Sequence, residues 1–133
     1  MTALDAHALA CMRRGLTHAR TGDYFAAHDD WEEVWQGLSG HRRLFWQAMI
    51  QLVVGGYHYG NGNRRGCQGQ WHKALHKCEE LLPHYAEPLP EPLTGLQTVL
   101  REGLALVEGS ADPLPALHTF TTTVMSDDWF SFP

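Results

Sequence analysis

The chain has 133 residues, of which 44% are hydrophobic and 19% are charged, the composition of one ordinary globular domain rather than of a disordered chain. Its formal net charge of -5 lacks the basic excess that binding to nucleic acid or to an anionic membrane surface requires. Neither a bilayer-spanning apolar run nor a secretory signal pattern is recognisable, so the sequence predicts a cytoplasmic protein that binds no nucleic acid and no membrane.

The expected secondary structure is helical throughout. Apolar residues recur with the 3.6-residue period of helices, and convincing strand alternation is absent. The expected helices cover about 3–21, 23–37, 41–60, 64–82, 92–109 and 113–125, with a proline-rich connector before the fifth. The sequence thus predicts a single all-α domain over residues 1–133, a compact bundle of five to six helices with an antiparallel central pair. Helix pairs of this kind suggest tetratricopeptide-like repeats, but no fixed internal period is apparent.

The helix expected at 23–37 combines an apolar side with several polar residues. The apolar arc of its helical wheel consists of Tyr24, Ala27, Trp31, Val34 and Trp35. His28 and Glu32 are four residues apart and therefore adjacent on the flank of that arc, where we expect both to be half-buried. The wheel directs Asp29, Asp30 and Glu33 toward solvent.

The helix expected at 41–60 is apolar on almost all sides and is therefore central. Its uncharged polar interruptions, Gln47, Gln51 and His58, fall on one stripe. Buried polar groups without partners cost about 1–3 kcal/mol each, so the stripe needs partners, and the short turn before it brings the helix 23–37 alongside. We therefore predict a polar cluster between the two helices, made of His28, Glu32, Gln47 and Gln51, with the place of His58 left open.

Two interpretations of this cluster remain open. In the first, it is a satisfied buried network that fixes the register of the two helices. In the second, His28 and Glu32 bind a divalent metal, because an imidazole and a carboxylate at i and i+4 can share one ion. Glutamine is a poor ligand for transition metals, so further ligands would have to come from His58 or from elsewhere.

Other residues that carry chemistry are assigned structural positions. Three cysteines without C-x-x-C spacing make a disulfide framework or a zinc ribbon unexpected, and Cys67 and Cys78 are expected in the core. The pair His72 and His76 is expected on the solvated face of its helix. The aromatic tail either folds back onto the core or covers a partner subunit, which makes a homodimer one alternative. Its large residues are Trp129, Phe130 and Phe132.

Several spaced motifs are similar to those of a known family. They are Phe25-x-x-His28-Asp29-x-x-Glu32-Glu33-x-Trp35, then Gln47-x-x-x-Gln51, then His58-x-x-x-Gly62-Asn63-Arg64-Arg65-Gly66. Over about 21–82 this pattern resembles the prokaryotic domain-of-unknown-function family 309. The resemblance implies a compact helical fold without an established activity, and the family's label of predicted metal-dependent hydrolase rests largely on the histidine–acid motif. Asp29 stands where the family usually has glutamate, and Cys67 where alanine is common.

The function expected from the sequence is that of a small helical binding or interaction domain whose protein partner is not identified. In this hypothesis the polar cluster is structural. The alternative is a metal-dependent hydrolase that uses His28 and Glu32, with His58 as a further residue. A nucleophile motif and a phosphate-binding glycine loop after a strand are both missing from the sequence, so other enzyme classes have little support.

Overall fold

The structure is a computed structural model that describes residues 4–132. Within these residues there are six α-helices: α1 (Ala6–Arg20), α2 (Tyr24–Trp35), α3 (Gly40–Gly60), α4 (Arg64–Leu81), α5 (Glu91–Glu108) and α6 (Leu114–Thr119). Short helical turns η1 (Leu82–His84), η2 (Phe120–Val124) and η3 (Asp127–Ser131) complete the described elements. No strand occurs within residues 4–132, so the predicted all-α bundle is confirmed, while the predicted start of the first helix at residue 3 lies outside the described residues.

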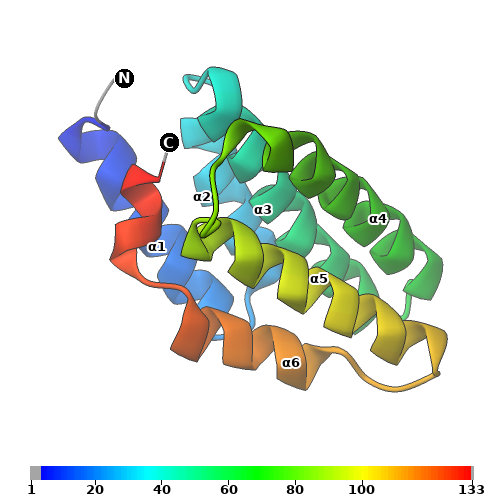
Figure 1. Cartoon of the computed structure of the whole chain (residues 1–133). Coiled ribbons are helices and arrows are strands. Elements are labelled where there is room, and N and C mark those ends of the chain that lie inside the picture. Colours follow the sequence, from blue (N-terminus) through cyan, green and yellow to red (C-terminus); the bar gives the residue numbers. More distant parts are fainter. Residues whose placement is uncertain (1–3, 133) are drawn as a thin grey trace.

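The helices form two layers. In Figure 1, α1, α2, α3 and α4 follow one another as a row of neighbours, and each packs on the next. The chain then crosses this row: α5 packs on α4 and α3, α6 packs on α3, and η2 and η3 contact α1. The first layer is therefore covered by the last third of the chain, and the apolar α3 lies between its neighbours as expected.

The first layer consists of two copies of one helical hairpin. In the first copy, Trp31 Nε1 donates a hydrogen bond to the carbonyl oxygen of Met12 at 3.1 Å. Forty residues later along the chain, Trp71 Nε1 donates to the carbonyl oxygen of Leu52 at 2.8 Å. The indole packs on a glycine in each copy, Gly15 in the first and Gly55 in the second. A Cβ added to either glycine would lie 2.2 Å from the indole nitrogen. A fixed internal period is therefore present, contrary to the expectation from the sequence.

The turns inside the two hairpins repeat as well. Gly22 and Gly62 have φ angles of +82° and +76°, which glycine adopts without steric cost. Each is followed by a residue that caps the next helix, since the side chain of Asp23 accepts from the backbone nitrogen of Ala26 and Asn63 caps α4 in the same way. Between the first copy and the second, the positions that are identical at the 40-residue offset are Leu4/Leu44, Ala8/Ala48, Gly15/Gly55, His18/His58, Gly22/Gly62 and Trp31/Trp71.

The aromatic tail folds back onto the core, which confirms the first of the two expectations for it. Trp129, Phe130 and Phe132 are all buried. The ring of Phe130 lies 5.9 Å from that of Trp46, and the ring of Phe132 lies 4.8 Å from that of Phe45. These contacts close the second layer over α3, the central helix of the first.

The described part of the chain contains no helix that is both long enough and apolar enough to span a bilayer.

Cys67 and Cys78 are buried and free, as predicted, and their burial has a consequence at high pH. Burial raises the pKa of both thiols from 9.0 to about 12. Between these two values the unfolded chain releases protons that the folded chain retains, so stability falls as the pH rises from about 9 through about 12, by at most about 1.4 kcal/mol per pH unit and thiol. Melting temperatures measured across this range should fall, and the double variant Cys67→Ala/Cys78→Ala should fall less steeply. Parallel curves for the two proteins would contradict this expectation.

Candidate functional site

The structure brings part of the predicted polar cluster together. His28 Nε2 and a carboxylate oxygen of Glu32 lie 2.6 Å apart, and both residues are half-buried on α2, as the helical wheel predicts. Gln47, Gln51 and His58 are half-buried along α3. Among the described side chains, however, no hydrogen bond joins these three to His28 or Glu32. Of the predicted network, the structure therefore contains only the contact between His28 and Glu32 within α2, as far as the described residues show.

Two buried polar atoms in this region have no hydrogen-bond partner among residues 4–132. They are His28 Nδ1 and Gln51 Oε1. His28 Nδ1 lies 3.3 Å from a carboxylate oxygen of Asp29, but the arrangement does not form a hydrogen bond. An unsatisfied buried polar atom costs about 1–3 kcal/mol, and such atoms concentrate where a protein is shaped by function as well as by stability.

The half-buried ring of His28 adjoins two exposed rings, and we call the three residues Phe25, His28 and Tyr57 the aromatic patch. The rings of Phe25 and Tyr57 are 5.1 Å apart, and those of Phe25 and His28 are 5.6 Å apart. Phe25 is 50% exposed and Tyr57 is 39% exposed, so two large aromatic side chains from neighbouring helices meet at the surface. The helical wheel indicates part of this patch, because Phe25 lies outside the apolar arc of its helix and is therefore expected at the surface.

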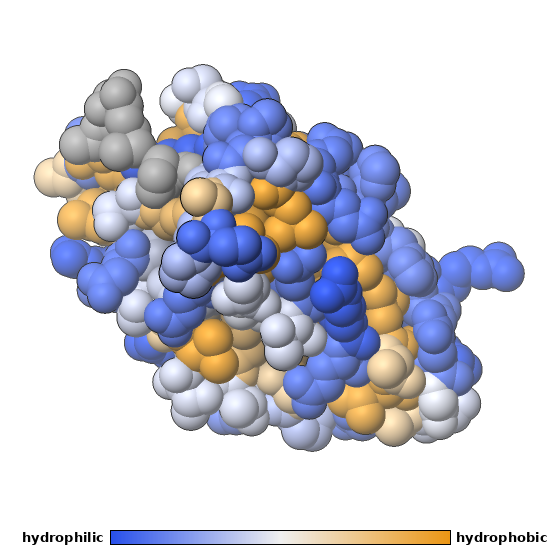
Figure 2. All heavy atoms as spheres, viewed as in Figure 1, coloured by the Kyte–Doolittle hydropathy of each residue, from blue (hydrophilic) through white to orange (hydrophobic). Residues whose placement is uncertain are grey.

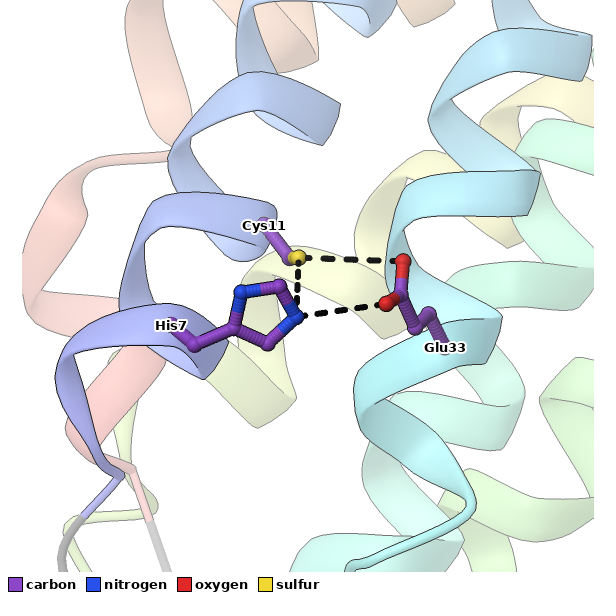
Figure 3. A group of neighbouring side chains, drawn as sticks. All are labelled: His7, Cys11 and Glu33. Atoms are coloured by element: carbon purple, nitrogen blue, oxygen red, sulfur yellow. Dashed lines mark hydrogen bonds and ion pairs between the residues drawn. The ribbon is translucent and has the colours of Figure 1, made fainter.

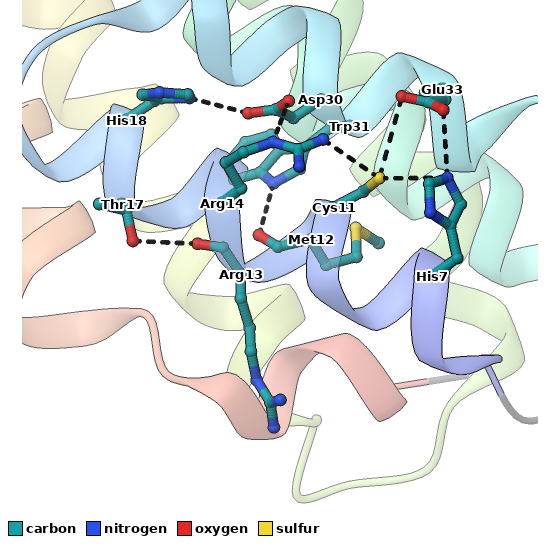
Figure 4. A network of polar contacts seen from close by, with 10 residues as sticks. All are labelled: His7, Cys11, Met12, Arg13, Arg14, Thr17, His18, Asp30, Trp31 and Glu33. Atoms are coloured by element: carbon teal, nitrogen blue, oxygen red, sulfur yellow. Dashed lines mark hydrogen bonds and ion pairs between the residues drawn. The ribbon is translucent and has the colours of Figure 1, made fainter.

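The prediction that Asp30 points to solvent is wrong. Its side chain is only 12% exposed and accepts hydrogen bonds from Arg14 Nε at 2.9 Å and from His18 Nδ1 at 2.8 Å (Figure 4). The bond to Asp30 also raises the pKa of the Arg14 guanidinium. The wheel of α2 treats this flank as solvent, whereas α1 packs against it. Asp29 and Glu33 are exposed, as predicted.

The same flank carries a group of potential metal ligands that the sequence pattern does not predict. His7 and Cys11, one turn apart on α1, converge with Glu33 from α2 (Figure 3). His7 Nε2 lies 3.2 Å from Glu33 Oε1, and Cys11 Sγ lies 3.7 Å from His7 Nε2 and 3.8 Å from Glu33 Oε2. His28 and Glu32 belong to no such three-residue group within the described chain, so the structure adds no further ligand to that pair.

A shallow groove of about 590 Å³ lies between α5 and α6. It combines small and apolar residues, among them Gly95, Ala116 and Val124, with the carboxylates of Glu102 and Asp112. On the face that α5 and α6 present, hydrophobic residues appear as separate patches among hydrophilic ones rather than as one continuous surface (Figure 2). The groove is thus a weaker candidate for recognition than two aromatic rings in contact.

Comparison with known proteins supports the family resemblance and adds no activity. No curated protein and no solved structure matches the chain. The comparisons therefore give no support to the alternative of a metal-dependent hydrolase. Residues 12–70, which include most of both hairpins and the whole aromatic patch, match the family described as "Domain of unknown function (DUF309)". The match confirms the predicted resemblance to this family over residues 12–70.

Proposed function

We propose that this chain is a protein-interaction module, and that its aromatic patch binds a partner segment that presents a basic side chain beside apolar ones. The observation that carries the proposal is the exposed contact between Phe25 and Tyr57. Large aromatic residues are enriched in protein interfaces and supply a large share of the binding free energy. An exposed apolar surface of this kind costs free energy in the unbound protein, which binding recovers.

The charge around the rings selects the partner. Asp29 follows Phe25 by one helical turn and its side chain is 61% exposed, and the Glu32 carboxylate is 45% exposed. A lysine or arginine of the partner can pair with these carboxylates and lie over an aromatic face, where cation–π attraction adds about 0.5–2 kcal/mol. A second copy of the chain would bring the same carboxylates to the same place, because a two-fold symmetric contact pairs a patch with itself. The charge therefore favours a different, basic partner over a homodimer.

The architecture supports the same conclusion. Helical hairpins repeated in tandem form extended scaffolds that many proteins use to present a binding surface. Here the patch spans the junction between the two copies, since Phe25 belongs to the first hairpin and Tyr57 to the second. The relative position of the two rings is fixed by the packing of α2 on α3 and does not depend on a flexible loop.

The proposal is tested with short labelled peptides that form amphipathic helices, one with lysine and one with glutamate beside the same leucines. The wild-type chain is expected to bind the lysine peptide in fluorescence anisotropy, and to bind it less tightly as salt is added. Phe25→Ala and Tyr57→Ala should each weaken this binding by about tenfold or more. Val124→Ala is the matched control, because Val124 is also exposed but lies in the groove between α5 and α6.

Three results would contradict the proposal. The first is equal binding of the lysine and glutamate peptides, and the second is loss of binding in Val124→Ala with full binding in Phe25→Ala. The third is a concentration-dependent dimer in sedimentation that Phe25→Ala converts to monomer, since the patch would then join two copies of the chain.

A further inference from the structure

We propose that His7, Cys11 and Glu33 form a three-ligand zinc site that links α1 to α2, separate from the aromatic patch. The three side chains point toward one another at the open end of the first hairpin, between the start of α1 and the end of α2 (Figure 3). Cys11 is buried, while the side chains of His7 and Glu33 are exposed. The site therefore has a closed side formed by the protein and an open side that faces solvent.

The distances between the ligand atoms fit a tetrahedral ion. With Zn–N near 2.0–2.1 Å, Zn–O near 2.0–2.2 Å and Zn–S near 2.3 Å, tetrahedral angles place the ligand atoms about 3.4–3.6 Å from one another. His7 Nε2 lies 3.2 Å from Glu33 Oε1 and 3.7 Å from Cys11 Sγ, and Cys11 Sγ lies 3.8 Å from the other carboxylate oxygen, Glu33 Oε2. With one oxygen of Glu33 as the ligand, the three ligand atoms lie within 4.8 Å of one another, so binding requires the exposed side chains of His7 and Glu33 to close around the ion.

The types of ligand select the metal. A thiolate, an imidazole and a carboxylate together suit Zn²⁺, whereas Mg²⁺ and Ca²⁺ bind mainly oxygen. Three protein ligands leave a fourth position for water, the arrangement of open zinc sites. The charges balance, because one thiolate and one carboxylate neutralise a divalent ion. Binding releases the thiol proton of Cys11 to solvent.

A second set of contacts holds the sulfur in place. Arg14 Nη2 donates to Cys11 Sγ at 3.4 Å, and Asp30 in turn binds Arg14 and His18 (Figure 4). A donor of this kind stabilises a thiolate, and the carboxylate of Asp30 offsets the positive charge of the guanidinium next to the ion. The partly buried Asp30, whose position the helical wheel did not predict, thus supports the site from the adjacent helical turn.

The other thiols of the chain do not compete at neutral pH. Burial raises the pKa of Cys67 and Cys78 to about 12, so both remain protonated and are poor ligands. The exposed histidines of α4 carry acidic neighbours, since His76 Nε2 lies 3.1 Å from a Glu80 carboxylate oxygen and His72 Nε2 lies 4.0 Å from one of Glu108. These histidines offer no thiolate, so a sulfur–metal signal at neutral pH reports on Cys11.

The test is titration of the untagged, reduced full chain with Co²⁺, a spectroscopic substitute for Zn²⁺. We expect one equivalent of Co²⁺ to produce a thiolate-to-cobalt charge-transfer band and tetrahedral visible bands, and one equivalent of Zn²⁺ to remove them. His7→Ala and Cys11→Ala should lose the charge-transfer band, and Glu33→Gln should weaken binding by about tenfold or more, since the loss of even an outer contact around a metal costs about 10–100-fold in affinity. His76→Ala is the matched control and should bind as the wild type does.

The outcomes separate a built site from surface binding. A charge-transfer band that disappears in His7→Ala and persists in His76→Ala supports the zinc site. Absence of the band in a correctly folded wild-type chain overturns the proposal, and so does a band that His7→Ala and Glu33→Gln leave unchanged. Circular dichroism of each variant verifies folding, and if Cys11→Ala fails to fold, the exposed His7 and Glu33 variants still decide the result. The peptide assay for the aromatic patch does not depend on this outcome.

Discussion

Replacing Gly55 by alanine is expected to lower the free energy of unfolding by about 3–5 kcal/mol, because the new methyl group overpacks the core and breaks a buried hydrogen bond. An alanine Cβ at this position would lie 2.2 Å from Trp71 Nε1 and 2.4 Å from its Cδ1. The indole has little room to retreat, since a Cβ placed on Gly103 at its other edge would lie only 2.6 Å from its Cζ3. The ring would have to leave its site and give up the bond to Leu52. Chemical unfolding of the variant measures the loss.

The matched control is Gly69→Ala in α4. An added Cβ on Gly69 meets no atom within 4 Å, so the substitution should be neutral or should stabilise the helix by up to about 1 kcal/mol. If Gly55→Ala unfolded at the same urea concentration as Gly69→Ala, the close approach of α3 to Trp71 would not be the contact that holds the second hairpin together. Gly15→Ala should reproduce the defect in the first hairpin, where the same contact occurs with Trp31.

The helices could be predicted from the sequence because their signals are local. Apolar periodicity gives the length of a helix, and the turn residues give its ends, so the expected 41–60 and 64–82 correspond closely to Gly40–Gly60 and Arg64–Leu81. The aspartate cap at residue 23 belongs to the same class of signal, since it depends on residues within one turn. Each of these features is decided by residues fewer than five positions apart.

The contacts between helices could not be predicted in this way. The helical wheel of α2 separates apolar from polar flanks, yet it does not show which polar flank faces α1. The wheel therefore predicts that Asp30 faces solvent, although Arg14 of α1 binds its carboxylate. The group of potential ligands could not be predicted for the same reason, because Cys11 and Glu33 are 22 residues apart and belong to different helices. The predicted polar cluster between α2 and α3 likewise remains a prediction, since no hydrogen bond joins Gln47 or Gln51 to Glu32 in the described chain.

The repeat of the two hairpins is not apparent in the sequence, and the reason is physical. The recurring positions with a shared structural role are those at which an indole packs on a glycine and those at which the chain turns. Elsewhere the two copies have different neighbours: Gly56 contacts Tyr24 and Leu117, whereas the equivalent position in the first copy carries Leu16. The second layer covers one copy differently from the other, so the intervening sequence follows the packing and not the period.

The second large effect is expected at the end of the chain, in Phe130→Ala. Phe130 is 1% exposed and lies against Trp46 of the central helix, so removing its ring leaves a cavity where the tail meets the first layer. Truncation of a buried phenylalanine costs about 3–5 kcal/mol, which is a large fraction of the stability of a domain of this size. Thermal or urea unfolding of the variant, in parallel with the wild type, measures the difference.

Phe25→Ala supplies the control and connects this prediction to the proposed function. It removes the same side chain from a position that is half exposed, so we expect a loss of stability below about 1 kcal/mol. The two variants should therefore separate the roles of aromatic residues in this chain: Phe130→Ala should weaken folding, whereas Phe25→Ala should weaken peptide binding in a protein that is still folded. A stability loss in Phe25→Ala as large as that in Phe130→Ala would mean that the exposed ring is part of the core, and it would remove the main argument for the aromatic patch as a binding surface.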